Sequence, residues 1–275
     1  AETVFLKLGG SLITDKTHRE SPRLAVIERL AGEIAEARRR RPGLRLLVGH
    51  GSGSFGHFAG REYRTHEGIL PGQEARGWYG YAVTGAAAAR LNRLVTDALI
   101  AAGLPAVTFQ PSASAWCQAG DLRELAWWPI RMGMEAGLLP VVHGDVALDA
   151  EQGCTILSTE EIFRYLANYL LPARVLLAGT VDGVFTADPL RQPDATRLPI
   201  LRAGAEAGAE SSLPALGGSH GIDVTGGMAA KVREMIELVR AHPELTVQIL
   251  SGEGAGGLLE TLLDPECSRG TRIIP

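Results

Sequence analysis

Short apolar runs alternate along this chain with glycine-rich turns and longer amphipathic stretches. The apolar runs have the length of buried strands. They fall at residues 4–8, 44–49, 106–109, 138–143, 174–178 and 246–250. The amphipathic stretches repeat their apolar residues with helical spacing; the clearest are residues 22–41, 78–102, 158–170 and 225–240. This alternation of strand and helix predicts a parallel α/β domain.

Local signals add detail to this pattern. Ser21-Pro22 predicts the start of the first long helix, because serine suits the N-cap and proline suits the first turn. Residues 146–156 carry a polar turn between two apolar runs and predict a hairpin. Residues 187–222 lack periodicity and predict a surface excursion, a candidate lid. There is no internal repeat, and no shift in composition separates two domains.

The composition narrows the class of protein. Hydrophobic residues occupy 45% of the 275 positions, which allows a large core and argues against disorder. The 27 basic and 31 acidic residues give a net charge of −4, so we expect neither a nucleic acid nor a membrane surface as partner. No apolar run approaches the ~20 residues of a membrane helix.

The cysteines and the first strand bear on the compartment. Cys117, Cys154 and Cys267 form no CxxC pair, and widely spaced cysteines fit a reducing environment. The sequence opens into a strand at Val4 without a charged and apolar leader. These features predict a cytoplasmic protein.

The first candidate for chemistry is the glycine-rich turn KLGGS at residues 7–11. A strand that ends in Gly-Gly-Ser lets backbone N–H groups approach a phosphate closely. Lys7 at the end of the strand and Lys16 in the following loop can direct their ammonium groups to the same place. An ordinary tight turn is the alternative interpretation.

A second glycine-rich turn, HGSGSFGH at residues 50–57, also follows a strand. It lacks the GK[ST] of a Walker A loop and the glycine spacing of a dinucleotide fingerprint. Two such turns on neighbouring strands can hold an accepting phosphate and a transferred one. His57 can hydrogen-bond the acceptor, because the pKa of a histidine and the second pKa of a phosphate are both near 6 to 7. A helix-capping role is the alternative.

Two further segments suit a nucleotide. Residues 179–189, GTVDGVFTADP, form a glycine- and aspartate-rich turn after a strand, which suits ribose and adenine. Residues 223–228, DVTGGM, precede Lys231, so N–H groups at a helix start and an ammonium group favour a polyphosphate. Each string alone is equally compatible with an ordinary loop or helix cap.

In this order, the segments KLGGS…ITDK, HGSGSFGH, HGD, GCTILS, VDGVFTADP and DVTGGMAAK resemble the amino acid kinase superfamily. The ITDK and SFGH elements resemble isopentenyl phosphate kinases within it. The resemblance implies a three-layer αβα sandwich with an open, mainly parallel sheet, as one domain over residues 1–275. It implies an acceptor-binding lobe at about 1–170, a nucleotide-binding lobe at about 171–275, and a homodimer.

The resemblance also implies a reaction and its residues. The expected reaction is ATP-dependent phosphorylation of isopentenyl phosphate, a small prenyl phosphate, with Mg²⁺ accompanying ATP. The expected catalytic residues are Lys7, Lys16, His57 and Lys231. The acceptor would be bound by Gly10, Ser11, Gly53, Ser54, Gly56, His57, Asp145 and Gly153. The nucleotide would be bound by Lys7, Gly9, Gly10, Ser11, Thr180, Asp182, Gly183, Asp188, Gly226, Gly227 and Lys231.

The chain departs from the family where Ser-Gly-Asp is common. It has Ser158-Thr159-Glu160 there. The family aspartate orders the catalytic lysines; Glu160 keeps the charge on a longer side chain, and Glu161 is a possible substitute. The departure leaves the fold unaffected but bears on rate and nucleotide affinity.

Two further expectations concern the apolar tail of the acceptor and the alternative functions of the protein. An isoprenoid tail needs an apolar pocket, for which Val83 and the small residues from Ala86 to Ala89 are candidates, although alanines also suit a close helix–sheet contact. The nearest alternative is a kinase for another small phosphate or a phosphonate such as fosfomycin. A nucleotide-binding sensor without catalysis is a further one.

Overall fold

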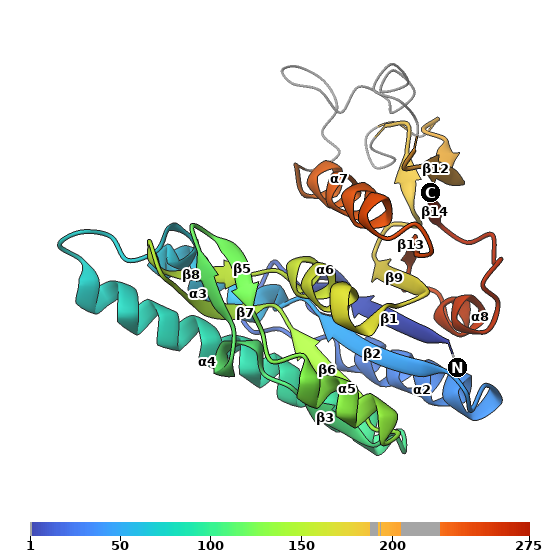
Figure 1. The fold of residues 1–275 in the computed structure, drawn as a ribbon, viewed down its shortest axis with the longest axis horizontal. Helices are drawn as coiled ribbons and strands as arrows, with labels where there is room; N and C mark the ends of the chain where they lie inside the picture. The colour runs from blue at the N-terminus through green and yellow to red at the C-terminus, as the bar shows by residue number, and fades with distance from the viewer. Residues whose placement is uncertain (1, 188–191, 193, 205–225) are drawn as a thin grey trace.

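An eight-stranded sheet forms the centre of the computed structural model, which describes residues 2–187, 192, 194–204 and 226–275 (Figure 1). The strand order is β12-β14-β13-β9-β1-β2-β6-β3, and only the β13–β14 pair is antiparallel. The bounds are β1 Thr3–Leu8, β2 Arg45–His50, β3 Ala106–Thr108, β6 Leu139–His143, β9 Arg174–Gly179, β12 Ile200–Arg202, β13 Thr246–Ser251 and β14 Thr271–Ile274. All six predicted strands are confirmed within two residues at each end.

Helices cover both faces of this sheet. In β1, Val4, Leu6 and Leu8 pack into one apolar cluster, whereas Phe5 packs into the other, because successive side chains of a strand point to opposite faces. The first cluster contains residues of α2 Leu24–Arg40, α4 Glu74–Ala101 and α8 Gly257–Leu263. The second contains residues of α5 Trp128–Glu135, α6 Thr159–Leu170 and α7 Gly226–Ala241. In Figure 1, α2 and α4 lie below the sheet and α6 and α7 above it, so the three-layer αβα prediction is confirmed.

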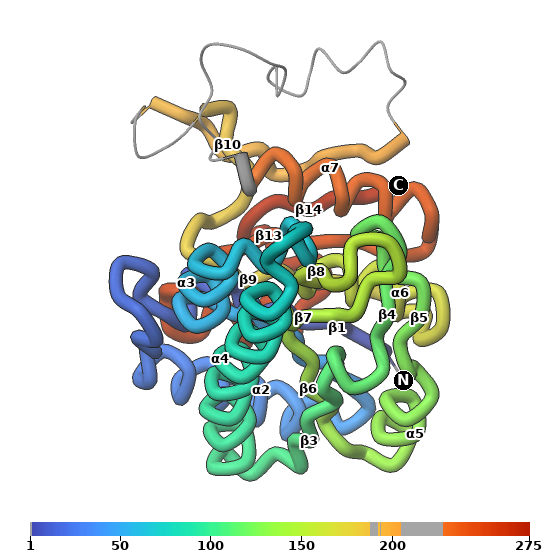
Figure 2. The backbone as a smooth tube through the Cα atoms, turned by 90° about the vertical axis from the view of Figure 1, so that its left-hand side faces the viewer, coloured from blue at the N-terminus to red at the C-terminus, as the bar shows by residue number. Residues whose placement is uncertain are grey.

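Smaller elements surround the ends of the central strands. Two short helices, α1 Gly10–Ile13 and α3 Gly53–Tyr63, directly follow β1 and β2, and Figure 2 shows α3 alongside α4. A second sheet has the order β5-β4-β7-β8, and its β7–β8 pair is the predicted hairpin. The bounds of the remaining elements are β4 Trp116–Gln118, β5 Asp121–Glu124, β7 Asp145–Asp149, β8 Gly153–Leu157, β10 Val184–Phe185, β11 Arg197–Leu198, η1 Thr65–Glu67 and η2 Pro111–Ala113.

The predicted helix start at Ser21-Pro22 is wrong. Pro22 forms a β-bridge with Thr14, and the backbone N–H of Ser21 donates to the hydroxyl of Ser54 at 3.0 Å. These contacts hold the segment extended, so α2 begins only at Leu24. The Ser-Pro pair signals a helix locally, but pairing with a distant segment overrides that signal.

The predicted excursion at 187–222 lies largely outside the described residues. Its described part contains β11 and β12, and β12 adds an edge strand to the central sheet. Among the described residues, no helix is long and apolar enough to cross a membrane. The sheet itself is continuous, since β1 pairs with β2 on one side and with β9 on the other.

Two histidines lie buried side by side at the ends of β2 and β6. The rings of His50 and His143 stack with their centroids 5.5 Å apart. His50 Nε2 lies 3.1 Å from Asn92 Oδ1, and Asn92 donates its Nδ2–H to Thr108 Oγ1 at 2.8 Å. Burial, with the charge of a protonated His143, lowers the pKa of His50 to about 4. The protein is therefore folded around a neutral His50.

This burial predicts that stability falls as the pH drops. Between pH 6.5 and 4 the unfolded chain binds a proton that the folded chain excludes, so the free energy of unfolding decreases by about 2 kcal/mol between pH 6.5 and 5 from His50 alone. Denaturant unfolding of His50→Gln should show a correspondingly weaker pH dependence. The exposed His66→Gln is the control and should keep the wild-type slope; equal slopes in all three proteins would contradict the assignment.

Candidate active site

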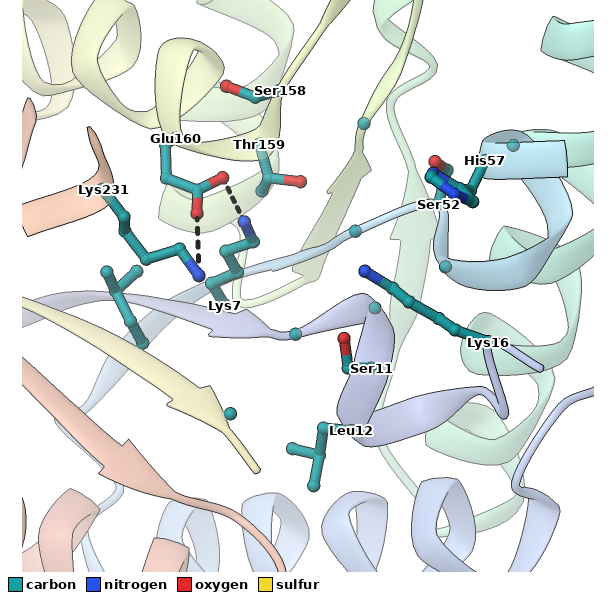
Figure 3. Close-up of a pocket in the computed structure, with 18 of the residues that line it drawn as sticks. Lys7, Ser11, Leu12, Lys16, Ser52, His57, Ser158, Thr159, Glu160 and Lys231 are labelled. Carbon is teal, nitrogen blue, oxygen red and sulfur yellow. Dashed lines mark hydrogen bonds and ion pairs between the residues drawn. The ribbon is translucent and has the colours of Figure 1, made fainter. Parts of the chain in front are cut away.

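A cleft of about 820 Å³ opens at the carboxyl ends of β1, β2 and β9. The chain runs from β1 to β2 on one side, and β9 joins β1 on the other, so this is the point where ligands bind in open α/β sheets. Its walls come from both predicted glycine-rich turns, from the start of α6 and from α7. Figure 3 shows the cleft with its charged residues.

A buried carboxylate joins two of the predicted catalytic lysines. Lys7 donates to Glu160 Oε2 in a close ion pair, and the Lys231 ammonium lies 3.8 Å from Glu160 Oε1 (Figure 3). Lys7 and Phe5 are two residues apart in β1, so their side chains point to the same face of the sheet. This face packs against α6, and Lys7 therefore reaches that helix. Lys7 and Glu160 are 8% and 5% exposed, so each charge depends on the other for compensation.

The pKa values in this cluster follow from burial and mutual charge. Burial lowers the pKa of Lys7, and the positive charge of Lys231 adds to that effect, while Glu160 opposes it. Burial alone would raise the pKa of Glu160, but the charges of Lys7 and Lys231 outweigh it and leave that pKa below its ordinary value. Glu160 is therefore an anion that holds two cations.

Lys16 enters the cleft from the loop after α1. Its ammonium extends toward the space between the two glycine-rich turns (Figure 3), and partial burial, with the charge of Lys231, lowers its pKa. All three predicted lysines therefore line one cavity, although they lie in distant parts of the sequence. Such a set of cations favours an anionic ligand with several charges.

The two glycine-rich turns touch each other. A Cβ on Gly10 would lie 2.8 Å from both the Cα and the N of Gly53, so neither turn tolerates a side chain at the contact. Gly53 has a positive φ of 52°, a conformation that glycine adopts without strain. Gly9 fixes the first turn by donating its N–H to Ala178 O at 2.8 Å. The contact places two sets of backbone N–H groups beside the same cavity.

Helix α3 begins at the second turn and carries His57 in its first turns. Gly53, Gly56 and the exposed His57 line the cleft, as Ser11 does from the first turn. The positive end of the helix dipole lies at Gly53, which favours a phosphate there. His57 is thus placed to contact an anion bound at the start of α3.

Four predicted acceptor residues do not line the cleft. Ser54 is buried and accepts the Ser21 N–H, Ala86 is exposed on α4, and Gly153 is the first residue of β8 and lies against Ile69. The Asp145 carboxylate accepts the Ser112 N–H at 3.1 Å and the Val146 N–H at 2.9 Å. Ala87 and Ala88 are buried in the core, which agrees with the helix-packing interpretation of the alanine run.

The predicted nucleotide residues divide in a similar way. Thr180 lines the cleft, whereas Asp182 binds Arg197 at 2.7 Å and accepts the Ser251 N–H at 3.1 Å. Gly183 has a φ of 102° and packs against Thr271. Gly226 and Gly227 open helix α7, and Asp188 lies outside the described residues.

The departure at Ser158-Thr159-Glu160 has a clear structural outcome. Ser158 caps α6 by accepting the Glu161 N–H at 3.0 Å, and Glu161 accepts the Ser158 N–H in return, which forms a capping box. Thr159 donates to the carbonyl of His50 at 2.7 Å. Glu161 is therefore occupied at the helix start, and Glu160 is the carboxylate that contacts the lysines.

Several cleft residues were not predicted individually as site residues, although some of them lie in the named segments. They are Leu12, Gly51, Ser52, Gly60, Arg61, His66, Gly144, Ile156, Leu157, Leu177, Ala178, Gly179, Val181, Met228 and Ile249. Arg61 had a usable signal, because it lies four residues after His57 and hence on the same helical face. His66 and Ile156 enter the cleft through the packing of η1 and β8, which no local pattern predicts.

Known proteins resemble this chain over nearly its whole length. The pattern of the amino acid kinase family matches residues 2–251. An isopentenyl phosphate kinase of Methanothermobacter thermautotrophicus is 38% identical over 98% of this chain and 98% of its own length. One of Haloferax volcanii is 35% identical over 93% of this chain and 98% of its own. A crystal structure of an isopentenyl phosphate kinase, 34% identical, superimposes with a TM-score of 0.83 over 99% of this chain and all of its own.

The chain therefore belongs to the amino acid kinase family. Its fold is the fold of this class of phosphotransferases, and the family pattern covers nearly the whole chain. Within the family, the expected similarity to isopentenyl phosphate kinases is confirmed.

The ion pairs of Glu160 predict a large effect of a neutral substitution. In Glu160→Gln, two neighbouring ammonium groups lose their shared anion, so we expect kcat to fall roughly a hundredfold and the free energy of unfolding to fall by about 3 kcal/mol. Steady-state kinetics and denaturant unfolding measure both effects. Glu161→Gln is the matched control. It weakens only the capping box, so kcat should stay within about threefold and stability within about 1 kcal/mol; similar kinetics in the two variants would contradict the role of Glu160.

Proposed function

We propose that this protein phosphorylates isopentenyl phosphate at the expense of ATP. The observation that carries the proposal is the convergence of Lys7, Lys16 and Lys231 on one cleft that also contains the start of α3 and His57. The similarity to isopentenyl phosphate kinases over nearly the whole chain supports the acceptor. The product would be isopentenyl diphosphate.

The reaction presents an electrostatic problem. A phosphate monoester and the triphosphate of ATP are both anions, and they repel each other more strongly as water leaves the cleft. Positioning and charge neutralisation account for most of phosphoryl-transfer catalysis. In the proposed arrangement Lys7 and Lys231 act on the nucleotide phosphates, Lys16 acts on the moving phosphoryl group, and Glu160 keeps the first two in place.

The transfer itself needs no general base. A phosphate monoester is largely deprotonated near pH 7, so one of its oxygens can attack the γ-phosphorus directly. The new bond joins that oxygen to phosphorus, and the bond to the bridging oxygen of ADP breaks. His57 then serves as a hydrogen-bond donor that binds the acceptor phosphate, with the start of α3 at Gly53 beside it.

We propose that magnesium enters bound to the phosphates of ATP. Among the described residues, no three metal-ligating side chains gather into a metal site. The cleft carboxylates are engaged, Glu160 by two lysines and Glu161 by the capping box. The bound ion would neutralise phosphate charge, while the residues of this chain position the two substrates.

The prenyl tail would lie against the apolar part of the acceptor side. Ile156 and Leu157 of β8 line the cleft together with Gly56 and Gly60 of α3, which are four residues apart and share a helical face. A Cβ on Gly60 would lie 2.9 Å from Ile156 Cδ1, so the two elements already touch there. A short tail is therefore the better fit.

A panel of acceptors tests the proposed function. ATP consumption should be fast with isopentenyl phosphate, slower with geranyl phosphate, and near background with fosfomycin and acetylglutamate. Detection of the diphosphate product by ³¹P NMR identifies the bond formed. Preference for fosfomycin would assign the chain to phosphonate kinases, and no turnover with any acceptor would favour a nucleotide sensor.

His57 gives a residue-level prediction for the same assay. His57→Ala should raise the KM for the acceptor and lower kcat by roughly ten- to a thousandfold, because one donor to the acceptor phosphate is lost. The KM for ATP should change little. His242→Ala, outside the cleft, is the control; near-normal kinetics of His57→Ala would remove His57 from the site.

We also predict that the protein is a homodimer. The molar mass of the protein in solution tests this prediction directly.

A further inference from the structure

Arg61 is a cation of the cleft to which none of the roles above applies. It lies on α3, one helical turn after His57, and lines the same cavity. Residues four apart share a helical face, about 6 Å from each other along the axis. Helical side chains lean toward the N-terminus, so the long Arg61 side chain covers the turn that carries His57. Arg61 is thus within reach of an anion bound at the start of α3.

Among the described arginines of α3 and its C-cap, Arg64 has a carboxylate partner and Arg61 has none. Arg64 pairs with Glu67, and Arg90 pairs with Glu20. Glu62, next to Arg61 in sequence, pairs instead with Arg19 at 3.1 Å. Among the residues that the structure describes, no carboxylate lies within ion-pair distance of Arg61. Within the described part of the chain its charge is therefore unpaired, and Lys16 and His57 line the same cleft.

We propose that Arg61 is an acceptor-binding residue whose guanidinium pairs with the phosphate of the acceptor. The nucleotide is a poorer partner, because Thr180 and Lys231 lie on the other side of the cleft, at the ends of β9 and α7. A guanidinium presents two parallel N–H donors that match two phosphate oxygens. The inference rests on the proposed function for the identity of the acceptor.

The pairing determines acceptor affinity more than rate. The oxygens that Arg61 contacts remain on the acceptor phosphorus before and during transfer, so the contact contributes about equally in the ground state and the transition state. Loss of such a contact raises KM and leaves kcat nearly unchanged. This separates Arg61 from His57, whose loss should lower kcat as well.

The test compares Arg61→Gln with Arg61→Lys and with Arg93→Gln. Arg93 is exposed on α4 and pairs with Asp97, so its substitution removes the same charge away from the cleft. In Arg61→Gln we expect the KM for isopentenyl phosphate to rise about tenfold, with kcat and the KM for ATP within twofold of wild type. Arg61→Lys should recover part of the affinity. High salt should reduce the difference between wild type and Arg61→Gln, because the pair is exposed to solvent.

Two outcomes overturn the proposal. Kinetics of Arg61→Gln that match those of Arg93→Gln remove Arg61 from acceptor binding, and a fall in kcat with unchanged KM assigns it a different role. Calorimetric binding of isopentenyl phosphate and of inorganic phosphate without ATP keeps this test separate from the function. If the wild type binds phosphate more tightly than Arg61→Gln but never phosphorylates isopentenyl phosphate, Arg61 stands as an anion-binding residue and the proposed function fails. Matching unfolding midpoints establish that the variants are folded.

Discussion

The carboxylate of Glu160 is the interaction on which the rest of the site depends. Two ammonium groups from opposite ends of the chain, Lys7 and Lys231, would repel each other in a partly dry cleft. A single buried anion, at the start of α6, offsets that repulsion and fixes both side chains. The capping box of Ser158 and Glu161 in turn fixes the helix that carries it. The two lysines of this buried network are thus also cations that line the cleft.

The sheet explains why such distant residues meet. The carboxyl ends of parallel strands lie at one edge of the sheet. β1 lies between β2 and β9, at the point where the order of the strands along the chain reverses. The first turn therefore contacts the second turn directly, at Gly10 and Gly53, with no room for a side chain. The two turns therefore line the cleft side by side. Thr159 donates to the His50 carbonyl, and Asn92 contacts the buried His50 ring. These two contacts fix the start of the second turn.

Much of this arrangement could be predicted from the sequence, because it depends on local patterns. The apolar runs predicted the six strands that were named from the sequence. The glycine-rich segments led to Lys7, Lys16, His57 and Lys231, all of which line the cleft. What the sequence did not predict depends largely on contacts between distant segments. Pairing with Thr14 moved the start of α2. Asp145, which accepts two backbone N–H groups, does not line the cleft. Glu160 rather than Glu161 contacts the lysines because the Glu161 side chain caps α6. Ile156 lines the cleft because the β7–β8 hairpin packs beside it.

The most direct test of the account is a crystal structure with a non-hydrolysable ATP analogue and isopentenyl phosphate bound together. The account predicts the γ-phosphate among the ammonium groups of Lys7, Lys16 and Lys231, with the acceptor phosphate at the start of α3 beside His57. Glu160 should still contact Lys7 in that complex. Nucleotide phosphates bound outside this cleft, or an acceptor phosphate far from α3, would contradict it.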